Sequence, residues 1–458
     1  MNCALSMRVL LACQIPCCGL MHCLAVDSPQ HTAVLPPPIA LAAPAATADW
    51  PHWRGLDRND STTESSGWDG QRWLKDSPSW EANVGLGSTS PLVADGHVYV
   101  MGWENGQDRV RCLDARKGRP IWMGSYPCPK HGRYASGDES LYGGVTSTPE
   151  WDPTTHLLYT LSCDGDLICW DTDAAGKKAW GFNLYDHFHV KQRPATNVPG
   201  SEVRDYGYTT SPFVYGDWLI VEVGANDGCV MAFDKRTGDR RWVSQYRGPA
   251  GHTGGLTPIT VDSVSCAAIL TLRALVVVRM DAGHEGQTAA QYPWESAWGD
   301  NILTPTAVGD SVLIGSWHTH RSLCRLRITL HGATRVWDAP DISHVGSPVV
   351  QGGFVYIAAG RLSCLDWATG KRVWAGGSYD NGGAVIATGD GKLVVWSDTG
   401  RAALVKSARE SPAAYTELTR TPRLFGDGSM AWPHPVLADG LMFVKNMAGT
   451  LRCFAHAR

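Results

Sequence analysis

The chain has 458 residues, a formal net charge of −4 and 18 % charged residues. This charge gives no reason to expect a nucleic-acid partner. No apolar run after residue 50 reaches the roughly 20 residues that would span a bilayer, so we expect no transmembrane segment in the mature chain. The 50 glycines, 27 prolines and 20 tryptophans indicate a chain with many turns and an unusual number of large aromatic side chains.

Residues 1–48 differ in composition from the rest and predict a signal segment. An apolar stretch follows Arg8, and the small residues Ala46, Thr47 and Ala48 have the form of a signal-peptidase site. Cleavage after Ala25 is the alternative. We therefore expect export to the periplasm or beyond. The competing interpretation is a misassigned start codon followed by a tail without function.

Residues 49–77 are polar and rich in turn-forming residues. They predict an N-terminal arm laid across the domain that follows. Residues 78–458 then carry one repeated pattern, which we take to be a single domain because a repeat ring uses its whole length as one unit.

The repeated pattern is an apolar run, Asp, three residues (four after Asp171), Gly, three residues and Trp, typical of two strands joined by a tight turn. The Asp carboxylate can accept hydrogen bonds from the turn amides, and the Gly can adopt the positive φ that closes a bulged hairpin. Looser copies end at Trp294 and Trp337. The four close copies are Asp114, Gly118 and Trp122; Asp171, Gly176 and Trp180; Asp234, Gly238 and Trp242; and Asp366, Gly370 and Trp374. Because each Trp recurs at a fixed position of the repeat, we expect a structural role between neighbouring repeats.

A small residue or His followed by Pro precedes most copies, as in Ser90-Pro91 and Ser347-Pro348. Counting these markers, with one unit near Ala384 that lacks the proline, gives eight units of four short antiparallel strands. Such units are the blades of a β-propeller. The last unit lacks a fourth strand, whereas an extra strand near Trp80 precedes the first unit. The sequence therefore predicts an all-β, eight-bladed β-propeller of four-stranded antiparallel blades, closed into a ring by an N-terminal strand.

These repeats resemble the PQQ-like (quinoprotein-type) β-propeller family over residues 49–458. The resemblance implies the fold strongly and the function weakly, because the family includes periplasmic quinoprotein dehydrogenases as well as the propeller lipoprotein of the outer-membrane β-barrel assembly machine. Many other envelope propellers share the repeat.

Nine cysteines follow the leader. Cys112, Cys169, Cys364 and Cys453 occupy the same position in different units, so they cannot pair with one another. We expect them to be small buried apolar residues. A bond between Cys163 and Cys169 is a lesser alternative, and no spacing indicates zinc.

Long insertions are concentrated in the connections from strand four to the next strand one, at residues 124–146 and 181–210, with shorter ones at 246–256 and 295–303. The strand-two-to-three loops at residues 103–108 and 316–321 emerge on the same side, which we call the long-loop face. Loops on a rigid scaffold commonly carry function. The candidate binding residues on this face are His131, Arg133, Asp138, Tyr142, His187, His189, Arg193, Arg204, Asp205, Tyr208, His318 and His320. The alternative is that the long loops only plug the central channel.

Two His-x-His pairs on this face, His187 with His189 and His318 with His320, would present both imidazoles on one side of an extended strand, as two metal ligands require. Exposed loop histidines without a metal are the more common case, and we assign no metal site. Carboxylates such as Asp138 and Asp205 could serve acid–base chemistry, but no defined separation between two of them is evident. Trp103, Trp298 and Trp317 are loop tryptophans of the kind that bind ligands.

A PQQ-dependent oxidoreductase is the main alternative to a binding protein. The part of the chain after the leader lacks the vicinal cysteines of many alcohol-oxidising relatives, and no calcium-ligand set or catalytic aspartate matches a family motif. We therefore predict an exported, monomeric binding or scaffolding module of the bacterial envelope without a cofactor. Its partner would be an envelope protein, or a small-molecule or glycan ligand, on the long-loop face. A metal-assisted enzyme acting on a polysaccharide is the third possibility.

Overall fold

The computed structural model describes residues 49–129, 143–190, 207–296, 299 and 301–457. The chain separates into two units, Met1–Pro36 and Pro37–Arg458, and every described residue belongs to the second. The predicted leader lies outside the described residues.

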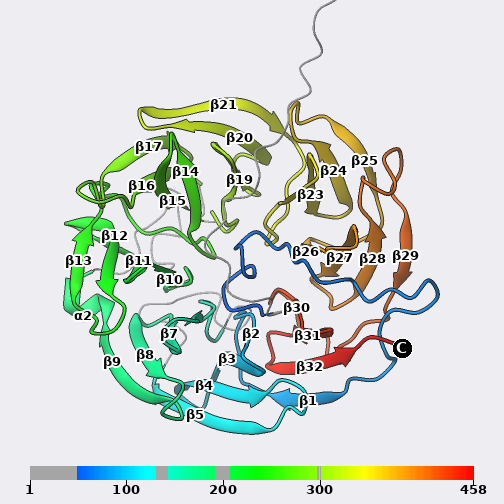
Figure 1. Ribbon diagram of the computed structural model, residues 1–458, viewed down its shortest axis with the longest axis horizontal. Helices are drawn as coiled ribbons and strands as arrows, with labels where there is room; N and C mark the ends of the chain where they lie inside the picture. Colours follow the sequence, from blue (N-terminus) through cyan, green and yellow to red (C-terminus); the bar gives the residue numbers. More distant parts are fainter. Residues whose placement is uncertain (1–48, 130–142, 191–206, 297–298, 300, 458) are drawn as a thin grey trace, which may run out of the picture. The chain divides into compact units, whose positions relative to one another are not determined.

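The described strands form eight four-stranded antiparallel sheets arranged as the blades of a ring (Figure 1). This confirms the predicted eight-bladed β-propeller. Blades 1 to 4 consist of β2 (Leu92–Ala94), β3 (His97–Glu104), β4 (Gln107–Asp114) and β5 (Pro120–Pro127); β6 (Glu150–Asp152), β7 (Leu157–Leu161), β8 (Asp166–Asp171) and β9 (Lys177–Asn183); β10 (Phe213–Tyr215), β11 (Trp218–Ala225), β12 (Gly228–Asp234) and β13 (Arg240–Val243); and β14 (Thr257–Val261), β15 (Val264–Leu270), β16 (Ala274–Arg279) and β17 (Thr288–Pro293).

Blades 5 to 8 follow the same order from the centre to the rim. They consist of β18 (Thr306–Val308), β19 (Ser311–Ser316), β20 (Ser322–Thr329) and β21 (Gly332–Ala339); β22 (Val349–Gln351), β23 (Phe354–Ala358), β24 (Leu362–Asp366) and β25 (Arg372–Gly376); β26 (Gly383–Ala387), β27 (Lys392–Ser397), β28 (Ala402–Lys406) and β29 (Glu417–Arg420); and β30 (Val436–Ala438), β31 (Leu441–Lys445), β32 (Thr450–Ala455) and β1 (Trp80–Asn83).

The ring closes as the sequence predicts. Strand β1 pairs antiparallel with β32, with Trp80 opposite Cys453 and Asn83 opposite Thr450. The fourth strand of blade 8 is thus supplied from the start of the domain, so that β32 has no unpaired edge.

The Trp and Gly of the repeat meet between neighbouring blades. A Cβ on Gly176 of blade 2 would lie 2.3 Å from the Trp122 ring of blade 1, and one on Gly238 would lie 2.9 Å from Trp180. Both glycines have positive φ, +73° and +79°. The glycine therefore serves twice, because it closes the turn and leaves room for the indole of the preceding blade.

Serine and threonine markers link the first strands of adjacent blades by hydrogen bonds. His434 N donates to Ser90 Oγ (2.8 Å), Ser90 N to Thr148 Oγ1 (3.0 Å), and Thr148 N to Ser211 Oγ (3.2 Å). The hydroxyl at this position therefore pairs a backbone amide of the neighbouring blade at the inner edge of the ring.

The nine described cysteines are free thiols and are all buried. Cys112 and Cys453 belong to the apolar clusters between blades. In the described part of the chain, no helix has the length and apolar character needed to cross a membrane.

One predicted loop is absent. Residues 103–108 do not form an insertion on the long-loop face, because β3 and β4 continue to Glu104 and from Gln107. Only Asn105 and Gly106 turn between them, both with positive φ (53° and 77°). A two-residue turn of this kind fits the twist of a hairpin and extends the blade instead of a loop.

Candidate functional site

The N-terminal arm enters the ring and crosses its centre, where Figure 1 draws it in blue among the first strands of the blades. Trp50 pairs with Val93 of β2 in blade 1, and Ser61 pairs with Ala387 of β26 in blade 7. Between them, Trp53 Nε1 donates to Thr304 Oγ1 at 2.9 Å, ahead of β18. We call residues 49–66 the plug. The sequence predicts an arm across the ring, but it does not predict this depth of insertion.

Arg58 holds the plug against blades 2 and 3. Its side chain forms a two-point ion pair with Glu150, with Nη1 3.0 Å from Oε2, and its guanidinium lies 4.5 Å from the centre of the Phe213 ring. His52 Nδ1 lies 3.1 Å from Glu150 Oε2, and the amide of Val214 donates to Oε1 at 2.9 Å. Burial alone would raise the pKa of Glu150, but Arg58 and His52 outweigh it and lower the pKa below its usual value.

Arg54 forms the second buried ion pair of the plug, with Asp60. Its Nη1 donates to Thr306 Oγ1 (2.9 Å) and its Nη2 to the carbonyl of Pro348 (2.7 Å). Burial raises the pKa of Asp60, but Arg54 and His434 outweigh it and lower the pKa. The two buried arginines of the plug, Arg54 and Arg58, are thus each compensated by a carboxylate of the chain.

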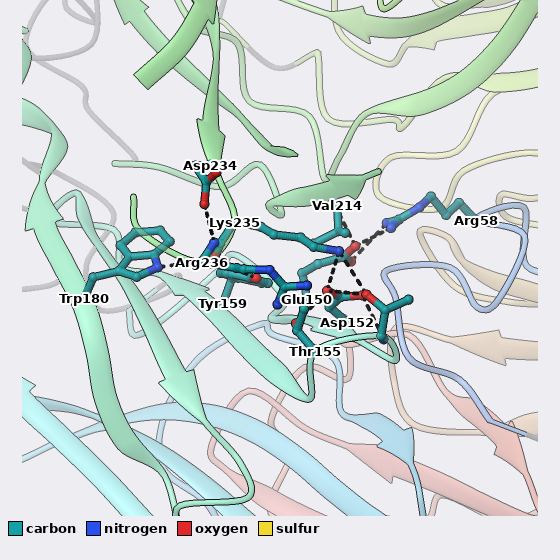
Figure 2. A network of polar contacts seen from close by, with 11 residues as sticks. Arg58, Glu150, Asp152, Thr155, Tyr159, Trp180, Val214, Asp234, Lys235 and Arg236 are labelled. Carbon is teal, nitrogen blue, oxygen red and sulfur yellow. Dashed lines mark hydrogen bonds and ion pairs between the residues drawn. The ribbon is translucent and has the colours of Figure 1, made fainter. Parts of the chain in front are cut away.

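Lys235 and Asp152 continue this network outward. Figure 2 shows Lys235 reaching Asp152 while Arg58 reaches Glu150 two residues earlier. The Lys235 Nζ lies 2.9 Å from Asp152 Oδ2, and both side chains are buried. Thr155 donates a further hydrogen bond of 2.6 Å to that carboxylate. The network therefore joins the plug to blade 2 and to the turn of blade 3.

On the long-loop face, the connection between blades 2 and 3 begins with a short helix, α2 (Leu184–Phe188), capped by the side chain of Asn183. His187 packs on Phe182 with ring centres 4.9 Å apart, and His189 caps the helix in the left-handed conformation. These two histidines therefore do not lie on an extended strand, which corrects the geometry assumed for a metal pair. Tyr208 is buried and donates to Val223 O at 2.8 Å, so its hydroxyl points inward.

His318 and His320 lie in a turn and not on a strand, so their predicted geometry is also wrong. His320 stacks on Trp294 with ring centres 3.8 Å apart. His318 packs edge-on against His344 at 5.4 Å, and His344 contacts both Trp317 and Trp432, each at 6.1 Å.

We call Trp317, His318, His344 and Trp432 the His344 cluster. Its residues come from a loop within blade 5, from the connection between blades 5 and 6 and from the connection between blades 7 and 8. The side chain of Trp317 is 38 % exposed. Large, partly exposed aromatic side chains next to imidazoles are typical of recognition surfaces. The sequence identified Trp317 and His318 separately, but it gave no sign that Trp432, more than 80 positions beyond His344, joins them.

Seven of the predicted binding residues lie outside the described residues, namely His131, Arg133, Asp138, Tyr142, Arg193, Arg204 and Asp205. The other five divide between two sectors of the ring, His187, His189 and Tyr208 at blades 2 and 3, and His318 and His320 at blade 5.

A buried polar cluster lies between blades 1 and 2. Burial and the nearby Asp164 raise the pKa of Asp108 to about 7. The thiol of Cys128 donates to Asp164 Oδ2 at 3.1 Å, and burial raises the pKa of Cys128 well above its usual range. Asp108 was not identified from the sequence, because nothing in its neighbours indicates burial of a carboxyl.

The described residues do not fit the PQQ and calcium that the fold family suggests. PQQ is a flat, anionic quinone that requires cationic partners and space, and a propeller offers that space at its centre. Here the plug crosses the centre, and Arg54 and Arg58 are already paired with Asp60 and Glu150. Within the described ranges, no three His, Cys, Asp or Glu side chains converge as metal ligands would.

Comparisons with known proteins agree on the architecture. The family model described as outer membrane protein assembly factor BamB matches residues 108–376, more than half of the chain. BamB from Moraxella catarrhalis is 12 % identical with a TM-score of 0.57, over 83 % of this chain and 99 % of that one.

Two further solved structures show how far this likeness extends. Quinohemoprotein alcohol dehydrogenase from Comamonas testosteroni is 16 % identical with a TM-score of 0.59, over 90 % of this chain and 81 % of its own. The computationally designed Ika8 protein is 12 % identical with a TM-score of 0.53, over 81 % of this chain and 98 % of its own. Likeness at this level therefore shows the fold alone. A search of curated proteins found no match.

Proposed function

The chain belongs to the PQQ-like propeller family whose model is described as outer membrane protein assembly factor BamB, and from this membership we propose that it is an exported binding or scaffolding module of the bacterial cell envelope. The match over residues 108–376 carries the proposal. A module of this kind needs a rigid body and a displayed surface. The ring of eight closed blades provides the rigid body.

The surface proposed for binding is the His344 cluster on the long-loop face. Trp317 supplies exposed aromatic area, while His344 lies between it and Trp432. Rigid aromatic anchors give contact area at a low cost in conformational entropy, which is why they dominate recognition sites. An envelope protein or a glycan could stack on this surface.

An oxidoreductase is the second candidate, since quinohemoprotein alcohol dehydrogenase shares the fold. The plug weighs against it, because a cofactor at the centre would have to displace the plug and its two buried ion pairs. We derive no reaction step for this chain.

The test uses full-length protein purified from the native envelope, examined by mass spectrometry, absorbance and metal analysis. We expect recovery in the envelope fraction with an envelope component at constant stoichiometry. That component should be lost from Trp317→Ala and retained by Val336→Ala, which removes a 45 % exposed side chain from the rim of the same blade. Stoichiometric quinone or calcium, or cytoplasmic protein with an intact Met1, would refute the proposal.

A further inference from the structure

The outermost strand of blade 1, β5, differs from the other rim strands in what it exposes. Ile121 and Met123 are 50 % and 53 % exposed, more than any other large apolar side chain described. They project from the same side of the strand, because Trp122 between them is buried, although Ile121 is the extra residue of a β-bulge in the pairing with β4. Between Pro120 and Pro127, β5 contains no charged residue.

Charges protect most of the other rim strands. Exposed charged side chains occur on β1, β9, β13, β21 and β25, and they include Lys177, Arg240, Arg335 and Arg372. Strand β29 carries partly exposed charged side chains. An uncharged edge with apolar side chains is a template for another strand, and proteins usually block such edges with charge. Strand β17 is also uncharged, but its two alanines are buried and its fully exposed side chains are Gln291 and Pro293.

The environment of β5 selects the kind of strand that fits. Lys117 and Arg119 lie just before it and are exposed, and neither has an ion pair with another described residue. The two prolines lack an amide hydrogen, so they limit an added ladder to residues 121–126. All strand pairs within the blades are antiparallel, so an added antiparallel strand would place its carboxyl-terminal end beside Arg119.

We propose that β5 is a docking edge for an extended segment of a partner protein, in which apolar residues alternate and acidic residues follow at the carboxyl-terminal end. The segment pairs antiparallel as a fifth strand of blade 1, its apolar side chains cover Ile121 and Met123, and its carboxylates face Lys117 and Arg119. This site lies at the rim and is independent of the His344 cluster.

The experiment uses the full chain and a fluorescent eight-residue peptide in which valine and threonine alternate before two carboxyl-terminal aspartates. Binding is measured by anisotropy, and the site by amide hydrogen exchange. We expect the peptide to slow exchange at residues 121–126. The same peptide with its aspartates at the amino-terminal end should bind about threefold more weakly, the size expected for exposed ion pairs.

Met123→Lys should weaken binding at least fivefold, because it places a charge against the apolar side of the added strand. If Met123→Lys unfolds, Ser125→Lys on the same face of the strand replaces it as the test variant. The control is Val373→Lys on β25, a 37 % exposed position on a strand that already carries Arg372, and it should bind normally.

Three results would overturn the proposal. The first is that the peptide slows amide hydrogen exchange outside β5 instead of within it. The second is that Met123→Lys, Ser125→Lys and the wild type bind the peptide equally well. The third is a wild-type dimer in sedimentation that Met123→Lys converts to monomer, which would make a second copy of this chain the occupant.

Discussion

At the scale of single residues, the repeat works because its three fixed residues have defined physical tasks, and the glycine has two of them. Asp114 Oδ1 accepts hydrogen bonds from the amides of Arg116 (2.9 Å) and Lys117 (2.7 Å) and thereby fixes the turn. Gly118 takes a φ of +66° at the end of that turn. A Cβ there would lie 2.5 Å from the Trp80 ring of the preceding blade, so turn and blade contact depend on the same glycine.

Two glycines with almost equal φ separate the steric effect from the backbone effect. Gly176 has φ +73°, and a Cβ added to it would lie 2.3 Å from the Trp122 ring, whereas Gly96 has φ +72° and open space around it. Gly96→Ala should lower the free energy of unfolding by about 1 kcal/mol through the left-handed backbone alone. Gly176→Ala should cost about 1–3 kcal/mol more, because the indole has to move. Chemical denaturation of both variants measures the difference, and equal losses would contradict the contact.

Asp108 predicts a pH dependence of stability. The pKa of this carboxyl is about 7 in the folded protein, against 3.8 for an ordinary Asp. Between pH 3.8 and about 7, the folded state therefore holds a proton on Asp108 that the unfolded state has released. Stability should therefore fall as pH rises from about 4 to about 7 and then level off. Asp108→Asn should remove this component and raise the melting temperature at pH 8 by a few degrees.

Melting curves at pH 5 and pH 8 measure the effect of Asp108→Asn. The control is Asp262→Asn, at an exposed position, which should leave the difference between the two pH values unchanged. The same difference in wild type and Asp108→Asn would refute the assignment.

At the scale of elements, the plug is the part that sequence reasoning described least well. The repeated hairpins are local, since Asp366 and Trp374 are only eight positions apart, and a sequence pattern of that length shows them directly. The contacts of the plug are not local. Arg54 donates to Pro348, 294 positions away, and the pairing of Arg58 with Glu150 appears only once the blades are arranged in a ring. The His344 cluster was missed as a unit for the same reason.

Breaking the ion pair between Arg58 and Glu150 should destabilise the ring. Glu150→Gln leaves the buried guanidinium of Arg58 uncompensated, a change that typically costs about 3–5 kcal/mol. The control is Asp227→Asn, which breaks the exposed pair with Arg240 and should cost less than about 1 kcal/mol. Denaturation midpoints compare the two. Adding Arg58→Met to Glu150→Gln should restore part of the loss, and a double variant less stable than the sum of the single changes predicts would refute the pairing.

At the scale of the whole ring, the N-terminal segment closes the structure twice, once through the plug and once through β1. Strand β1 covers the edge of β32, and Trp80 donates from its indole to Ala115 O of blade 1 at 2.9 Å. The plug joins first strands across the centre, from Val93 of blade 1 to Thr306 of blade 5. Each blade packs against a neighbour on both sides, so the plug and β1 both stabilise the ring as a unit.

Three amino-terminal truncations distinguish these two closures. A chain starting at Asp49 keeps both and should match the full-length chain in stability. A chain starting at Ser77 keeps β1 but loses the plug, which leaves Glu150 buried without Arg58, so it should fold with a clearly lower melting temperature. A chain starting at Gly85 also exposes the edge of β32 and loses Trp80, at a cost of about 3–5 kcal/mol for the indole alone, and it should aggregate. Melting and light scattering measure the series. If the chains starting at Asp49 and Ser77 were equally stable, the plug would be dispensable, and if that starting at Gly85 stayed monomeric and folded, β1 would not be what closes the ring.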